Sequence, residues 1–189
     1  MHRLPVVQGR AAVHEDWTPR PDEFDAIPLL CDAGGRQYTY LRLSVTDRCD
    51  LACVYCMPSS GEEDHALRRE LLTFEEAARL VSVFASAGIR RVRLTGGEPL
   101  VRKDIVRLVD LVSRRTKVES LVMTTNATRL DALAQPLEAA GLRGVNISLD
   151  TLDADRFAQI TTALHKSRAA GIWGVFWRAS TRRSMRASR

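Results

Sequence analysis

The chain has 189 residues, of which 45% are hydrophobic and 27% are charged, and its formal net charge at pH 7 is +5. This composition excludes a fibrous or disordered protein. The length suffices for one domain with a hydrophobic core but not for a full β/α barrel, which usually needs ~250 residues. No apolar run is long enough to span a membrane, and the first residues lack the pattern of a secretory signal. We therefore expect a cytoplasmic protein with no membrane partner.

The positive charge is concentrated at the end of the chain. Residues 156–189 contain 8 of the 28 Lys and Arg residues and no acid, so the preceding part has 20 basic residues against 23 acids and a net charge of −3. A basic tail does not by itself indicate nucleic-acid binding, and we expect no nucleic-acid partner.

Residues 1–37 contain four prolines and no lasting apolar period, which predicts an irregular N-terminal arm. From residue 38 onward, strand and helix patterns alternate. We expect strands at 38–45, 89–95, 118–124 and 145–149, and helices at 73–87, 104–115, 128–140 and 153–160. Thr73 and Glu76 have the spacing of a capping box. The predicted fold class is α/β, a partial (β/α) barrel of about four parallel units over residues 38–162.

Residues 163–189 depart from this alternation. They contain two tryptophans and six arginines but no acid, and they show no clear period. A basic arm is one interpretation. A truncated, frame-shifted or mispredicted end is the other, and the inconsistency with the preceding pattern favours it.

Three of the four cysteines are crowded into a segment directly after the first predicted strand. They are Cys49, Cys53 and Cys56, in the spacing Cys-x3-Cys-x2-Cys. In a cytosolic chain such crowding is typical of metal binding rather than of disulfides. Three thiolates on one short loop can ligate three irons of a 4Fe–4S cluster and leave the fourth iron open, as in a reactive metal site. A zinc site is the weaker alternative because zinc signatures usually pair two halves. Its fourth ligand would come from Cys31, His14 or His65.

The cysteine spacing after one strand and the turn Gly96-Gly97-Glu98-Pro99 after the next resemble the radical S-adenosylmethionine (SAM) superfamily. Longer strings narrow the resemblance to the GTP 3′,8-cyclases of molybdenum cofactor biosynthesis, also called molybdenum cofactor biosynthesis protein A. These strings occur in the family's order between about residue 34 and about residue 161. They are LRLSVTDRC at 41–49, YCMP at 55–58, VRLTGGEPL at 92–100, TTN at 124–126 and NISLD at 146–150.

The resemblance implies a role for each matching residue and no catalytic residue beyond the cluster and SAM site. Cys49, Cys53 and Cys56 would ligate the cluster; Tyr55, Gly96, Gly97, Glu98 and Ser148 would bind SAM; Arg42, Arg93 and Thr124 would bind GTP. Guanidinium groups suit phosphate oxygens, and a carboxylate suits the ammonium of SAM. Taken singly, an arginine in a strand is usually a surface residue, and a Gly-Gly pair is a turn. The cysteine loop, the Gly-Gly-Glu turn, Asn126 and Ser148 all fall at the C-terminal ends of the predicted parallel strands, which favours the functional interpretation of the set.

The resemblance also implies a reaction and its partners. An electron from the cluster would cleave SAM, and the 5′-deoxyadenosyl radical would take the 3′ hydrogen of GTP, which then cyclises to 3′,8-cyclo-7,8-dihydro-GTP. The implied partners are GTP, an electron donor such as flavodoxin or ferredoxin, and a downstream cyclic pyranopterin monophosphate synthase, with a homodimer left open. The alternatives are a radical SAM enzyme acting on another substrate, such as a peptide, and a non-catalytic fragment.

The sequence departs from the family pattern in several places. The family continues past residue 189 with further barrel units and a second cluster held by three more cysteines, whereas no cysteine follows Cys56. Asp50, Ala52 and Ala127 stand where Asn, Arg and Gly are usual in the family. We therefore expect this chain to bind a cluster weakly and not to turn over GTP.

Overall fold

The structure is a computed structural model that describes residues 27–56 and 65–161. The elements, in chain order, are β1 (Tyr40–Ser44), η1 (Arg68–Glu70), α1 (Phe74–Ser86), β2 (Arg91–Thr95), η2 (Pro99–Val101), α2 (Ile105–Arg115), β3 (Ser120–Thr125), α3 (Leu130–Ala139), β4 (Gly144–Ile147) and α4 (Ala154–Thr161). All eight predicted strands and helices are present, with bounds that differ by no more than two residues. The 3-10 helices η1 and η2 were not predicted. The predicted arm over 1–26 and the predicted basic tail over 163–189 lie outside the described residues, so this division of the chain stays a prediction.

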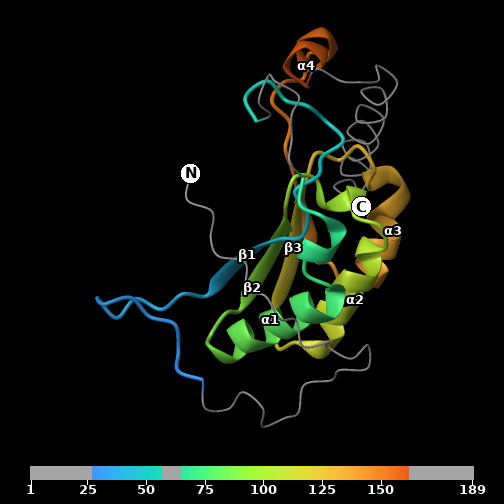
Figure 1. Ribbon diagram of the computed structural model, residues 1–189. Helices are drawn as coiled ribbons and strands as arrows, with labels where there is room; N and C mark the ends of the chain where they lie inside the picture. The colour runs from blue at the N-terminus through green and yellow to red at the C-terminus, as the bar shows by residue number, and fades with distance from the viewer. Residues whose placement is uncertain (1–26, 57–64, 162–189) are drawn as a thin grey trace, which may run out of the picture.

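The strands form one parallel sheet in the order β1-β2-β3-β4. Helices α1, α2 and α3 lie together on one side of this sheet (Figure 1). Leu43 of β1 is opposite Leu94 of β2, which is opposite Met123 of β3. The fold is thus a partial β/α barrel, as the alternation of elements predicted.

The hydrophobic core lies between the sheet and these helices. Val92, Leu94 and Met123 of the sheet are fully buried, and so are Leu108 and Val109 of α2. Alternate residues of the strands point to the opposite face, which is polar and exposed or half-buried. Two of the predicted GTP-binding residues, Arg42 and Arg93, stand opposite each other on that face.

Helix α1 begins at the predicted capping box. The Thr73 hydroxyl accepts a hydrogen bond from the Glu76 N–H at 3.1 Å, and the Glu76 carboxylate accepts one from the Thr73 N–H at 2.7 Å. These bonds satisfy two backbone N–H groups at the start of the helix.

We expect Thr73→Ala to lower the free energy of unfolding by about 1 kcal/mol, because the N–H of Glu76 loses its acceptor. Urea denaturation followed by circular dichroism measures the change. Glu76→Gln is the comparison, since its amide oxygen can still accept from Thr73 and should preserve more of the stability. An equal loss in both variants would contradict this account of the helix start.

Residues 27–37 are the described part of the arm predicted over 1–37; they contain no helix or strand and are hydrogen-bonded to the rest of the fold. A turn at Asp32–Gly35 brings Cys31 and Gln37 into an isolated antiparallel bridge. The N–H of Leu30 donates to the carbonyl of Ala87 at the end of α1. Among the helices described, none has the length and apolar character needed to cross a membrane.

Candidate cluster and cofactor site

Four segments meet at the C-terminal ends of the strands. The turn after β2 lies against the loop after β1, because the Gly97 N–H donates to the Thr46 carbonyl and the Glu98 N–H donates to the Arg48 carbonyl, both at 2.8 Å. The N–H of Ser148, just after β4, donates to the Thr125 carbonyl at 2.9 Å. The predicted motifs therefore share one edge of the sheet, as parallel topology requires.

The two glycines of the turn allow this close approach. A Cβ atom on Gly97 would lie 2.4 Å from the Arg48 carbonyl oxygen, and one on Gly96 would lie 2.3 Å from the Thr46 carbonyl oxygen. Gly96 also has a φ of +153°, which side-chain-bearing residues rarely adopt. The glycines thus allow two backbone segments of the protein to come together, and their contact with SAM stays a prediction.

The three clustered cysteines lie on the loop after β1. Cys49 and Cys53 are half-buried and Cys56 is exposed. The Leu51 N–H donates to the Cys49 Sγ at 3.4 Å, and the Cys56 N–H donates to the Cys53 carbonyl at 2.9 Å. Two buried side chains, Leu51 of the loop itself and Phe157 of α4, pack with Cys49, Cys53 and Leu149.

Burial raises the pKa of the Cys49 and Cys53 thiols above their ordinary range, and nearby acids add to the effect. For Cys49 these acids are Asp50 and Glu98, and for Cys53 the acid is Asp150. Thiolates at these positions therefore need positive charge close by, which bound iron supplies.

The donor set suits an iron–sulfur cluster better than a single ion. Three thiols on one loop, with N–H groups directed at Cys49, are the ligands that iron–sulfur clusters use. In the described part of the chain, no three His, Cys, Asp or Glu side chains are grouped so that they could hold one metal ion. The number and type of donors on the cysteine loop therefore match those of a cluster with three protein-held irons.

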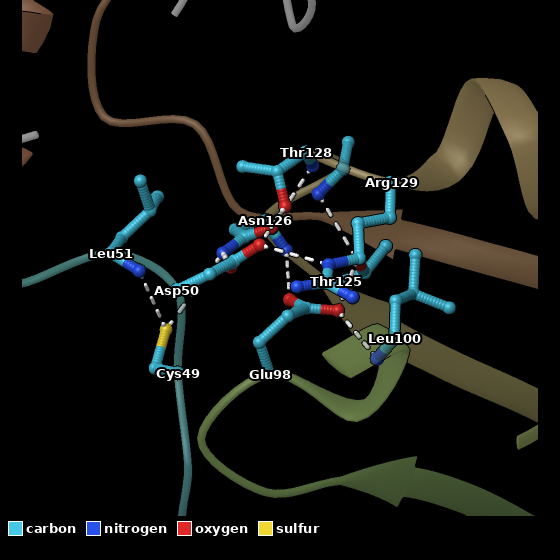
Figure 2. Close-up of polar contacts among 10 residues, drawn as sticks. Cys49, Asp50, Leu51, Glu98, Leu100, Thr125, Asn126, Thr128 and Arg129 are labelled. Carbon is cyan, nitrogen blue, oxygen red and sulfur yellow. Dashed lines mark hydrogen bonds and ion pairs between the residues drawn. The ribbon is translucent and has the colours of Figure 1, made fainter. Parts of the chain in front are cut away.

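Glu98 is 1% exposed and is fastened by three hydrogen bonds (Figure 2). Its carboxylate accepts from the Leu100 N–H at 2.9 Å, the Thr125 hydroxyl at 2.7 Å and the Asn126 N–H at 2.6 Å. Burial raises the pKa of Glu98, although these three hydrogen bonds act against the rise. The side chain therefore joins the ends of β2 and β3, a structural role that the sequence interpretation missed.

Asp50 links the cysteine loop to the loop after β3, a contact that the sequence did not predict. Its carboxylate accepts hydrogen bonds from the Asn126 amide at 2.9 Å, the Thr128 hydroxyl at 2.8 Å and the Arg129 guanidinium at 3.2 Å. Burial disfavours the ionised form, but these hydrogen bonds and the Arg129 charge outweigh it and hold the pKa of Asp50 below its usual range. The carboxylate next to Cys49 thus stays ionised and fastens the cysteine loop to the loop after β3.

Tyr55 lies between two of the cysteines and is exposed. Its hydroxyl donates to the Asp150 carboxylate at 2.8 Å, and this bond raises the pKa of Tyr55. Asp150 follows β4, so this contact brings Tyr55 close to the segment that carries Ser148. Asp150 was not among the predicted site residues.

The predicted GTP-binding residues lie on the polar face of the sheet. An Nη of Arg93 donates to the Thr124 hydroxyl at 3.1 Å, and its guanidinium lies 5.8 Å from the centre of the Tyr40 ring. The Arg93 Nε is buried and has no hydrogen-bond partner among the residues described. Arg42, the register partner of Arg93, is exposed. The structure therefore brings Arg93 and Thr124 into contact and leaves Arg42 facing solvent.

A parallel β/α sheet with a three-cysteine loop at its C-terminal edge is typical of enzymes that bind an iron–sulfur cluster. The chain belongs to the radical SAM superfamily, whose family model matches residues 43–177. Membership implies a 4Fe–4S cluster and S-adenosylmethionine as cofactors.

Curated relatives indicate which type of radical SAM enzyme the chain is similar to. The GTP 3′,8-cyclase of Heliobacterium modesticaldum is 54% identical over 146 residues, which cover 76% of this chain and 43% of the relative. The GTP 3′,8-cyclase of Ectopseudomonas mendocina is 45% identical over 152 residues, covering 76% and 45%. Molybdenum cofactor biosynthesis protein 1 of Drosophila melanogaster is 49% identical over 132 residues, covering 70% and 23%. The chain spans less than half the length of these relatives.

A solved structure of BtrN in complex with AdoMet and 2-DOIA aligns with 72% of this chain and 55% of that chain, at 18% identity and a TM-score of 0.48.

Proposed function

We propose that the protein is a GTP 3′,8-cyclase of molybdenum cofactor biosynthesis that binds a 4Fe–4S cluster through Cys49, Cys53 and Cys56. The observation that carries the proposal is the meeting of the cysteine loop with the Gly-Gly-Glu turn at one edge of the sheet, beside the pair Arg93 and Thr124. The identity of 54% to a GTP 3′,8-cyclase supports the choice of substrate. The cluster and SAM together would supply the radical that removes hydrogen from the substrate ribose.

The residues of the chain would orient these groups. Tyr55 and Ser148 stand at the edge where SAM would bind, and the turn at Gly96, Gly97 and Glu98 forms its floor. The Glu98 oxygen Oε2 accepts one hydrogen bond, from the Asn126 N–H, so this carboxylate retains capacity to accept from an ammonium. Arg42 and Arg93 would pair with the triphosphate, with Thr124 holding Arg93 in place.

The remaining partners belong to the same proposal. A one-electron donor such as flavodoxin or ferredoxin would reduce the cluster, and a cyclic pyranopterin monophosphate synthase would consume the product. Three free clustered thiols suit a reducing compartment, which supports a cytoplasmic location. A homodimer stays a prediction.

Cluster binding is tested by anaerobic reconstitution with iron and sulfide, followed by electron paramagnetic resonance of the reduced chain. We expect a 4Fe–4S signal that changes on addition of SAM, and we expect Cys53→Ser to remove it. Cys31→Ser is the matched control, because Cys31 lies in the antiparallel bridge to Gln37 and not on the cysteine loop. A signal that survives Cys53→Ser or ignores SAM would contradict the assignment.

Substrate binding is tested by titrating GTP into the SAM-loaded chain. We expect Arg93→Ala to weaken GTP binding about tenfold or more, because a charge-assisted hydrogen bond is worth about 1.5–3 kcal/mol. Arg90→Ala is the control, since Arg90 precedes β2 and faces Glu119. Equal affinity in the wild type and Arg93→Ala would exclude this residue from the substrate site. Mass spectrometry of the reaction mixture then tests the proposed activity: release of cyclised GTP would support it and would contradict the sequence-based expectation of no turnover.

A further inference from the structure

Asn126 contacts both the cysteine loop and the Gly-Gly-Glu turn (Figure 2). Its backbone N–H donates to the Glu98 carboxylate at 2.6 Å, and its side-chain amide donates to the Asp50 carboxylate at 2.9 Å. The same amide nitrogen lies 3.8 Å from the Sγ of Cys49, within hydrogen-bond distance for sulfur. One residue after β3 therefore reaches both the turn after β2 and the cysteine loop after β1.

The orientation of the Asn126 side chain is itself fixed. Its amide oxygen accepts from the N–H of Thr128 at 3.0 Å and lies 2.9 Å from the Thr128 hydroxyl oxygen, whose one proton is shared between this oxygen and the Asp50 carboxylate. This assigns the oxygen to Thr128 and leaves the nitrogen for Asp50 and Cys49. The donor to the sulfur thus cannot turn away without breaking two other hydrogen bonds.

The cysteine loop has other supports, but they act at different points. The N–H groups of Ala52 and Val54 donate to the carbonyls of Thr161 and Ile160 at the end of α4. These bonds hold the middle of the loop. The side chains of Asn126, Thr128 and Arg129 hold its beginning, at Asp50 and Cys49.

We propose that Asn126 is a positioning residue that fixes Cys49 relative to the Gly-Gly-Glu turn and donates a hydrogen bond to the cluster-ligating sulfur. The inference rests on the proposed role of Cys49 as a cluster ligand. A hydrogen bond to a ligand sulfur stabilises the more negative, reduced cluster, so Asn126 makes the cluster easier to reduce.

The test uses Asn126→Ala and Asn126→Asp, with Asn146→Ala as the matched control on the exposed face of β4. Asn126→Asp keeps the size of the side chain and its acceptor for Thr128 but lacks the amide donor. In the cluster-free chain, hydrogen exchange measured by mass spectrometry should become about fivefold faster over residues 47–56 in both variants, and remain unchanged in α1, because one lost hydrogen bond is worth about 1 kcal/mol. In the reconstituted chain, the ratio of reduced to oxidised cluster at a fixed potential should fall about fivefold in Asn126→Ala. It should fall further in Asn126→Asp, whose added negative charge also disfavours the reduced cluster.

Each outcome decides the inference. Unchanged exchange over residues 47–56 in both variants overturns it, as does faster exchange with an unchanged ratio of reduced to oxidised cluster. Faster exchange throughout the chain also overturns it, because Asn126 would then support the whole fold rather than Cys49. If the wild-type chain takes up no cluster, the proposed function is contradicted separately, and the local exchange of the cluster-free chain alone supports or overturns the positioning role.

Discussion

Glu98→Ala is expected to lower the free energy of unfolding by about 3–5 kcal/mol, because it leaves three buried donors without an acceptor and each such donor costs about 1–3 kcal/mol. The alanine would leave the Thr125 hydroxyl and the N–H groups of Leu100 and Asn126 without their acceptor in a buried place. Urea denaturation measures the loss. Glu119→Ala is the control, because Glu119 is exposed and its ion pair with Arg90 is long, at 3.8 Å, so its change should stay within about 0.5 kcal/mol.

Glu98→Gln keeps the shape of the side chain and removes its charge, so it shows how much of the loss in unfolding free energy depends on the carboxylate. The amide keeps one acceptor oxygen but places an N–H₂ group against one of the three donors, so we expect a loss smaller than that of alanine and still about 1–3 kcal/mol. If both variants unfolded like the wild type, the three hydrogen bonds would contribute nothing measurable to the fold, and the structural role of Glu98 would be wrong.

The pH dependence of stability provides a further check on Glu98. Burial raises the pKa of this carboxyl in the folded chain above its ordinary value of 4.5. Between these two values the folded state binds a proton that the unfolded state has lost, so the contribution of Glu98 favours folding below pH 4.5 and declines as the pH rises through the folded pKa. We expect Glu98→Gln to remove this decline, seen as a flatter plot of unfolding free energy against pH. An unchanged slope would show that Glu98 does not titrate in this window.

Gly97→Ala is the other substitution with a large expected effect. The added Cβ atom would lie 2.4 Å from the Arg48 carbonyl oxygen and 2.8 Å from that of Asp47, so two backbone segments must separate. We expect loss of the hydrogen bonds from Gly97 to Thr46 and from Glu98 to Arg48, a destabilisation of about 2–4 kcal/mol, and no SAM-dependent change in the cluster signal.

Gly144→Ala is the matched control for this glycine. The nearest atom to its added Cβ would be a methyl carbon of Val122 at 3.9 Å, an ordinary contact, and stability should change by less than about 1 kcal/mol. Denaturation and paramagnetic resonance on both variants check the pair. Equal behaviour of the two variants would contradict the close approach of the turn to the cysteine loop.

The sequence predicted the local structure because local chemistry determines it. The capping box at Thr73 and the apolar periods of the helices depend on residues three or four positions apart. Parallel topology then placed the motifs at one edge of the sheet. The family resemblance supplied the cysteine and glycine motifs as a set.

The contacts inside the site could not be predicted in this way. Asp50 bonds to residues 76 to 79 positions further along the chain, and no local pattern indicates such a partner. Glu98 follows two glycines, which suggests an exposed turn or a ligand contact, yet it is buried. Burial of a charge depends on donors contributed by another strand, here Thr125 and Asn126, and these become visible only in three dimensions.

The strict β1-β2-β3-β4 order of the sheet has a consequence for synthesis of the protein. Each strand pairs with the one made just before it, and the hydrogen-bonded group from Cys49 to Arg129 is complete once β3 and the loop after it have left the ribosome. A nascent chain can therefore assemble the hydrogen-bonded part of the site around Asp50 from the N-terminus onward. Helix α4 then adds the apolar contact of Phe157 with the cysteines and the two carbonyls that accept from the N–H groups of Ala52 and Val54.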